Sequence, residues 1–159
     1  MLVTYQYHDA KWPIWDWIKK ISEGDTTHES MRIQDETLWI DVVYEARFAK
    51  KIKPIPWGEW KYKDSIVRTV EFEKYGKNKI DEMLKWLKKQ EWKKYDWIGI
   101  FSFIWFWIPI RNGRWFCSEF CYVHRMKFIA EVDRYDQKQT PYGSESQALV
   151  LKKFYAAQQ

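Results

Sequence analysis

The two halves of this chain have different patterns of apolar residues, and this difference constrains the fold most strongly. β-Forming residues recur in the first half, and we predict strands over residues 2–7, 28–33, 37–44 and 65–72. The polar turn at 34–36 should join the middle two strands as a hairpin, and residues 50–63 read as a loop. Helical patterns follow in the second half. Because strands and helices are segregated along the chain, the sequence predicts an α+β fold and not a βαβ repeat.

The second half predicts four helices. Residues 77–93 are amphipathic, with Ile80, Met83 and Leu87 on one face and lysines on the other. Residues 115–128 and 144–157 form two further helical segments, and Asp96 looks like the N-cap of an apolar helix over 97–110. That apolar run is shorter than the roughly 20 residues needed to cross a bilayer. A Trp-rich helix is also expected in the first half, over residues 13–24, where Pro13 begins it and Gly24 ends it.

Length and composition favour one domain over residues 1–159, because no Pro/Gly/Ser-rich linker interrupts the chain. The formal net charge of +5 leaves contact with an anionic surface possible. However, 22 acidic residues alternate with the basic ones, which is typical of an ordinary solvated surface. The N-terminal residues lack the pattern of a signal peptide, so we expect a cytoplasmic protein without a transmembrane segment.

Cys117 is the candidate nucleophile. It lies in the segment RWFCSEF, within the first turn of a predicted helix, where backbone N–H groups and the helix dipole stabilise a thiolate. The same N–H groups could bind an oxyanion. Cys121 lies one turn deeper and is expected to be a buried, structural thiol. The spacing of four residues suits few disulfides, so both cysteines should be free.

His28 is the candidate base. It stands where a polar loop enters a strand, a position that can hold a side chain rigidly while it faces a cleft. Glu45, at the end of the next strand, could orient the imidazole and complete a Cys, His, carboxylate arrangement. Glu29 and Asp41 are alternatives that the sequence leaves open.

Four segments, THESMRI, VVYEA, YDWIGIFSF and RWFCSEF, together resemble a known family. In this order they are similar to the circularly permuted, NlpC-like branch of papain-like enzymes, especially YiiX-like proteins and their phage-encoded relatives. The tail segment TPYGSESQAL resembles the final turn and helix of that family. One departure is that Glu29 and Ser30 follow the histidine, where the family usually has a small apolar residue.

The resemblance implies a permuted papain-like fold and a thiol hydrolase. Cys117 would attack an amide or ester carbonyl, His28 would act as its base, and Glu45 would orient His28. Tyr95, Trp115 and Tyr44 are the expected substrate contacts. The implied substrate is a peptide, a peptidoglycan-type polymer or, alternatively, a lipid acyl group. No metal or organic cofactor is implied.

Three other interpretations compete with the hydrolase. A non-enzymatic binder of an anionic partner would use lysines interleaved with Trp57 and Trp60. A membrane-surface protein would use the aromatic cluster at 105–107. A zinc site formed by Cys117, Cys121 and His124 is disfavoured, because the outer two lie about 10.5 Å apart along a helix and zinc binds its ligands at about 2 Å.

Overall fold

The computed structural model describes residues 1–9, 19, 25–47, 50–73, 77–96, 116–130 and 141–156. Within these ranges the chain forms a five-stranded antiparallel sheet and three helices, so the α+β prediction is confirmed. The predicted helices over 13–24 and 97–110 lie outside the described residues, apart from Lys19, and so does Trp115.

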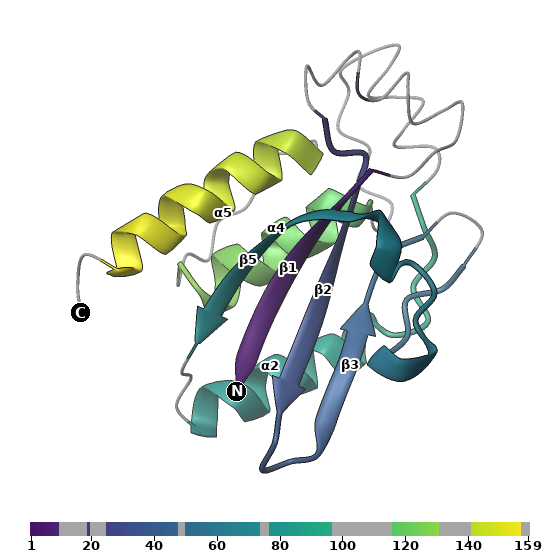
Figure 1. The fold of residues 1–159 in the computed structure, drawn as a ribbon. Helices are drawn as coiled ribbons and strands as arrows, with labels where there is room; N and C mark the ends of the chain where they lie inside the picture. Colours follow the sequence, from purple (N-terminus) through teal and green to yellow (C-terminus); the bar gives the residue numbers. More distant parts are fainter. Residues whose placement is uncertain are drawn as a thin grey trace.

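The sheet has the strand order β4-β3-β2-β1-β5, with antiparallel pairing between all neighbours (Figure 1). Its strands are β1 (Leu2–His8), β2 (His28–Asp35), β3 (Ile40–Tyr44), β4 (Ile55–Pro56) and β5 (Ile66–Glu73). The N-terminal strand therefore lies inside the sheet, between two strands that follow it in the sequence.

The predicted hairpin of β2 and β3 is confirmed, although β3 starts later than expected. The Asp35 carboxylate accepts hydrogen bonds from the backbone N–H groups of Thr37 and Leu38, at 2.9 and 3.1 Å. These bonds form a tight Asx-type turn, and Trp39 follows with a left-handed φ of 53°. The turn thus occupies residues that had been assigned to the strand.

The loop predicted over 50–63 was wrong in part. It contains the short strand β4 and the 3-10 turn Trp57–Glu59, and a second such turn follows at Lys63–Ser65. A proline argues against a central strand, but β4 lies at the edge of the sheet, where the missing N–H of Pro56 needs no partner.

Three helices cover one face of the sheet: α2 (Lys77–Gln90), α4 (Cys117–Phe128) and α5 (Pro141–Ala156) (Figure 1). They match three of the predicted helices with shifted ends. Alternate residues of β1, namely Val3, Tyr5 and Tyr7, join the helices in the buried core. None of the helices in the described ranges is both long and apolar enough to span a membrane.

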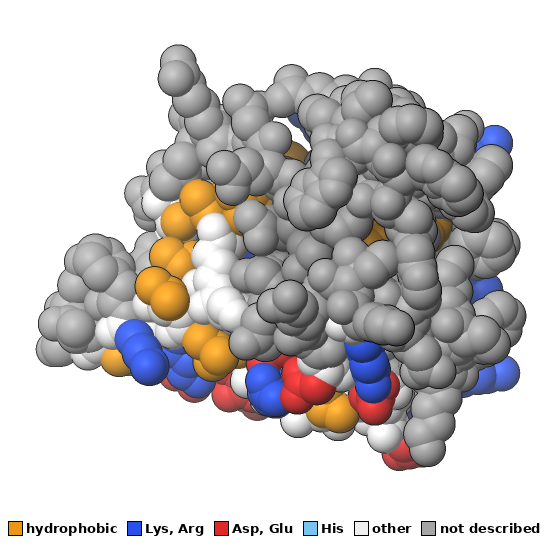
Figure 2. Space-filling view, turned by 90° about the horizontal axis from the view of Figure 1, so that it is seen from above, with side chains coloured by type: hydrophobic (Ala, Val, Ile, Leu, Met, Phe, Trp, Pro, Cys, Tyr) orange, Lys and Arg blue, Asp and Glu red, His pale blue; other side chains and the backbone are white. Residues whose placement is uncertain are grey.

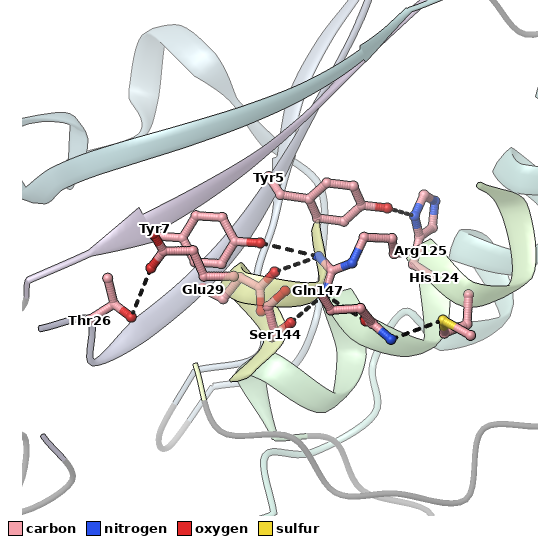
Figure 3. Close-up of polar contacts among 10 residues, drawn as sticks. Tyr5, Tyr7, Thr26, Glu29, His124, Arg125, Ser144 and Gln147 are labelled. Carbon is pink, nitrogen blue, oxygen red and sulfur yellow. Dashed lines mark hydrogen bonds and ion pairs between the residues drawn. The ribbon is translucent and has the colours of Figure 1, made fainter. Parts of the chain in front are cut away.

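A buried polar network ties α4 to the sheet and to α5 (Figure 3). Arg125 of α4 is fully buried and donates to Glu29 of β2 at 3.0 Å and to the Tyr7 hydroxyl at 3.2 Å. It also donates to the Ser144 carbonyl of α5 at 2.8 Å. Glu29 follows His28 directly in β2, and Arg125 lies two turns beyond Cys117 in α4. The network therefore fixes α4, which carries Cys117, to β2, which carries His28.

Candidate active site

Cys117 is the first residue of α4 and so lies in the first turn of this helix, as predicted, although the helix starts two residues later than expected. Its side chain is fully buried and is a free thiol. The preceding residue, Phe116, has no side-chain acceptor, and its backbone N–H points at the Glu119 carboxylate at 3.5 Å. The thiol therefore lies at the positive end of the helix dipole, which favours a negative charge on sulfur.

His28 lies between Cys117 and Glu45. Its Nε2 is 3.1 Å from Glu45 Oε2, and its ring is also within hydrogen-bonding reach of the Cys117 side chain. Since Nε2 is directed at the carboxylate, Nδ1 is the ring nitrogen left for the thiol. His28 and Glu45 are both buried. Three residues from β2, the end of β3 and the start of α4 thus meet at one end of the sheet.

The two alternative carboxylates lie elsewhere. Glu29 points to the helix-covered face of the sheet, where it pairs with Arg125. Asp41 forms a bidentate pair with Arg32, with both N–O distances at 2.8 Å, on the exposed part of the hairpin. The structure therefore brings Glu45, and neither of its rivals, to the imidazole.

The charges around His28 favour the imidazolium. Burial by itself would lower the pKa of His28, but the negative charge and hydrogen bond of Cys117, followed by those of Glu45, raise it to about 10. The pKa of Glu45 is shifted in the opposite direction, downward. Burial would raise its pKa, but the hydrogen bond and charge of His28 and the charge of Arg47 lower it. At neutral pH the histidine is therefore protonated, with the Glu45 carboxylate on one side and the Cys117 side chain on the other.

Of the expected substrate contacts, Tyr95 reaches the site and Tyr44 does not. Tyr95 is buried and interacts electrostatically with Cys117. Burial, followed by the charges of Cys117 and Asp96, raises the pKa of Tyr95 well above its ordinary value, so the hydroxyl stays protonated. The Tyr44 hydroxyl instead donates to Glu91 at 3.5 Å.

A second histidine at the site was missed from the sequence. His8 of β1 pairs directly with His28 across the strands, and the two ring centroids are 5.6 Å apart. Its Nδ1 and Nε2 bond the hydroxyls of Ser65 and Ser30 at 3.0 and 2.8 Å. Burial, followed by the charge of His28, lowers the pKa of His8 to about 3. Only the strand register reveals this pair, and register is not visible in one sequence.

The other residues proposed for a metal site have different surroundings. Cys121 is buried, and burial raises its pKa well above the ordinary value. The Nδ1 atom of His124 shares a hydrogen bond with the Tyr5 hydroxyl at 2.7 Å. In the part of the chain that the structure describes, no three His, Cys, Asp or Glu side chains gather in a way that could hold a metal ion.

The aromatic residues proposed for an anionic partner are not an open stacking surface. Trp60 is buried, with its ring edge-on to His8, and Trp57 lies beneath the Arg32 guanidinium at 3.8 Å. On the face shown in Figure 2, basic and acidic side chains are interspersed along the lower edge. This pattern is that of an ordinary solvated surface and provides no continuous basic patch there.

A large open groove lies at the opposite end of the sheet from His28. It has a volume of about 860 Å³ and is lined by Met1, Gln34, Leu38 and Ile80, among others. The strand register places Leu2 and Gln34 at one end of the β1–β2 pair and the two histidines at the other. The groove is therefore separate from the thiol.

The two buried histidines with lowered pKa values, His8 and His124, predict that the free energy of unfolding falls as the pH drops below 6.5. His8 and His124 have pKa values lowered to about 3, so below pH 6.5 the unfolded chain takes up protons that the folded chain refuses, and stability falls. Each group contributes up to about 1.4 kcal/mol per pH unit. Urea unfolding between pH 5 and 8 measures this, and a flat profile would contradict it.

A scan against protein-family models finds no family that matches this chain, and a search of curated proteins finds no matching relative. The chemistry of the site is therefore inferred from its own geometry, namely a thiol at a helix N-terminus, a buried imidazole and a carboxylate.

Proposed function

We propose that this protein is a cysteine hydrolase that cleaves an amide or ester bond through a thioester intermediate. The observation that supports this most strongly is the contact of Cys117 with His28, whose second nitrogen is held by Glu45 at 3.1 Å. A nucleophile, a base and an orienting carboxylate in this order are what acyl transfer by a thiol requires.

In the first step, the Cys117 thiolate attacks the substrate carbonyl carbon. The tetrahedral intermediate then collapses, the C–N or C–O bond breaks, and the His28 imidazolium gives its proton to the leaving amine or alcohol. A thioester on Cys117 and a neutral imidazole remain. Water then attacks the thioester, His28 takes the proton from that water, and the carboxylic acid leaves as the thiolate is restored. Glu45 keeps the imidazole oriented and stabilises its positive charge throughout.

The oxyanion of the tetrahedral intermediate would form beside the first turn of α4. Backbone N–H groups at a helix N-terminus point toward this position and carry a partial positive charge. The Tyr95 hydroxyl, which is buried and stays protonated, would supply a further donor.

The α+β architecture supports the proposed permuted papain-like, NlpC-like fold with a YiiX-like chain order. The base His28 and the carboxylate Glu45 come first, on neighbouring strands, and the nucleophile Cys117 comes last, at the start of a helix. On this basis we propose a peptide or peptidoglycan-type substrate and a phage-type role.

Acylation by a small ester tests the proposal without knowledge of the natural substrate. p-Nitrophenyl acetate is suitable because it is small enough to reach a buried thiol. We expect a burst of p-nitrophenolate and one acetyl group on Cys117, which hydroxylamine should remove. Cys121→Ser should keep the burst, and Cys117→Ser should lose the thioester. Acetylation that is equal in both variants, or found on lysines alone, would overturn the proposed function.

A further inference from the structure

The Glu45 carboxylate has two partners, one on each oxygen. Oε2 is the atom 3.1 Å from His28 Nε2, and Oε1 forms an ion pair with Arg47 Nη1 at 3.5 Å. The terminal torsion of a glutamate side chain is soft, so a carboxylate held by only one oxygen can turn away from its partner. A partner on the second oxygen restrains that rotation and keeps Oε2 directed at the imidazole.

Arg47 is itself restrained by an aromatic ring. Its guanidinium lies over the Tyr62 ring, 3.3 Å from the centroid, and a quarter of its side chain is exposed. A planar guanidinium stacks on a ring in a way that the ammonium group of lysine does not. The ion pair with Glu45 is therefore held by a group with a fixed orientation.

The Tyr62 ring leads back to His28 by a second route. It lies edge-on to Trp60, with centroids 6.3 Å apart, and Trp60 lies edge-on to His8 at 5.3 Å. His8 in turn contacts the His28 ring. Arg47 thus belongs to a closed set of contacts that reaches the imidazole both through Glu45 and through packed rings.

We propose that Arg47 is a positioning residue of the candidate active site, which acts through Glu45 to fix the orientation of His28. Its importance for catalysis depends on the proposed function, but its effect on the imidazole does not. The charge of Arg47 also contributes to the lowered pKa of Glu45, which keeps the carboxylate ionised as an acceptor.

Arg32 provides a matched control on the same sheet. It too lies over an aromatic ring, that of Trp57 at 3.8 Å, and pairs with a carboxylate, that of Asp41. Its carboxylate partner is not that of the site: Glu45 binds His28 and Arg47, whereas Asp41 binds Arg32. Loss of Arg32 therefore removes the same kind of interaction without changing the orientation of Glu45.

The test compares Arg47→Gln, Arg47→Lys and Arg32→Gln by two measurements. The first is the NMR signal of the His28 Nε2 proton, which the bond to Glu45 should protect from exchange with water. The second is the rate of Cys117 alkylation at pH 6.5. Arg47→Gln should broaden or abolish the Nε2 signal and slow alkylation by about 10- to 100-fold, the usual effect of losing a group that orients a site residue. Arg47→Lys should restore part of both, and Arg32→Gln should change neither.

The two measurements separate this inference from the proposed function. An intact Nε2 signal in Arg47→Gln, with a wild-type alkylation rate, would overturn the role of Arg47. Equal losses in Arg47→Gln and Arg32→Gln would do the same, because the effect would then be general. Loss of the signal in Arg47→Gln alone, in a protein whose wild-type Cys117 forms no acyl-enzyme, would support the positioning role and refute the hydrolase.

Discussion

At pH 6.5, replacing His28 by glutamine will slow the alkylation of Cys117 by iodoacetamide by roughly 10- to 100-fold. A thiol with the ordinary pKa of about 8.5 is only about 1% thiolate at this pH, and the thiolate is the reactive form. In the wild type, the positive imidazolium of His28 lies next to Cys117, and a neighbouring positive charge favours the thiolate over the thiol. Glutamine has a similar volume to histidine but cannot carry this charge, so access to the buried thiol stays comparable.

Cys121 serves as the internal reference for this experiment. It lies on the same helix, is equally buried, and has a raised pKa, so it should react slowly in both proteins. Peptide mass spectrometry reports the two labelling rates from one sample. If Cys117 reacts no faster than Cys121 in the wild type, or if His28→Gln leaves its rate unchanged, the pairing of thiolate and imidazolium is refuted.

Replacing Arg125 by methionine will lower the free energy of unfolding by about 3–5 kcal/mol. The substitution keeps an apolar stem of similar length but leaves the Glu29 carboxylate buried without its counter-ion, and breaking a buried ion pair in this way costs about that much. Burial alone already raises the pKa of Glu29, and the charge of Arg125 opposes this. The Tyr7 hydroxyl and the Ser144 carbonyl lose a donor as well (Figure 3).

The exposed pair of Arg32 and Asp41 is the control for this prediction. Arg32→Met should cost less than about 1 kcal/mol, because water solvates the carboxylate that is left. The double variant Arg125→Met with Glu29→Gln should be more stable than Arg125→Met alone, since the orphaned charge is gone. Urea unfolding at pH 7 measures all three. Equal costs for Arg125→Met and Arg32→Met would contradict the importance of the buried pair.

Local sequence patterns predicted the α+β class and most of the helices and strands in the described residues. The spacing of Ile80, Met83 and Leu87 was enough to identify α2, and β-branched residues identified β2, β3 and β5. Errors arose where one side chain redirected the backbone. The Asp35 carboxylate bonds two backbone N–H groups and delays β3, while Pro56 is tolerated because β4 lies at the sheet edge.

Some residues of the candidate site could also be predicted from local sequence patterns, and others could not. Cys117 and His28 could be proposed because a helix start and a strand start are local features. Glu29 remained a rival of Glu45 until the structure placed it on the face opposite the imidazole, against Arg125. His8 and Arg47 could not be found, because their roles depend on strand register and on packing between distant segments.

The most direct test of the account is an NMR titration of His28 in the wild type and in Cys117→Ala. The account predicts a pKa of about 10 for His28 in the wild type, and a clearly lower value in Cys117→Ala, because the negative sulfur that stabilises the imidazolium is removed. The same titration should show His8 and His124 neutral down to about pH 3. A His28 pKa near 6.5 in the wild type, or one that Cys117→Ala leaves unchanged, would contradict the pairing on which the proposed function rests.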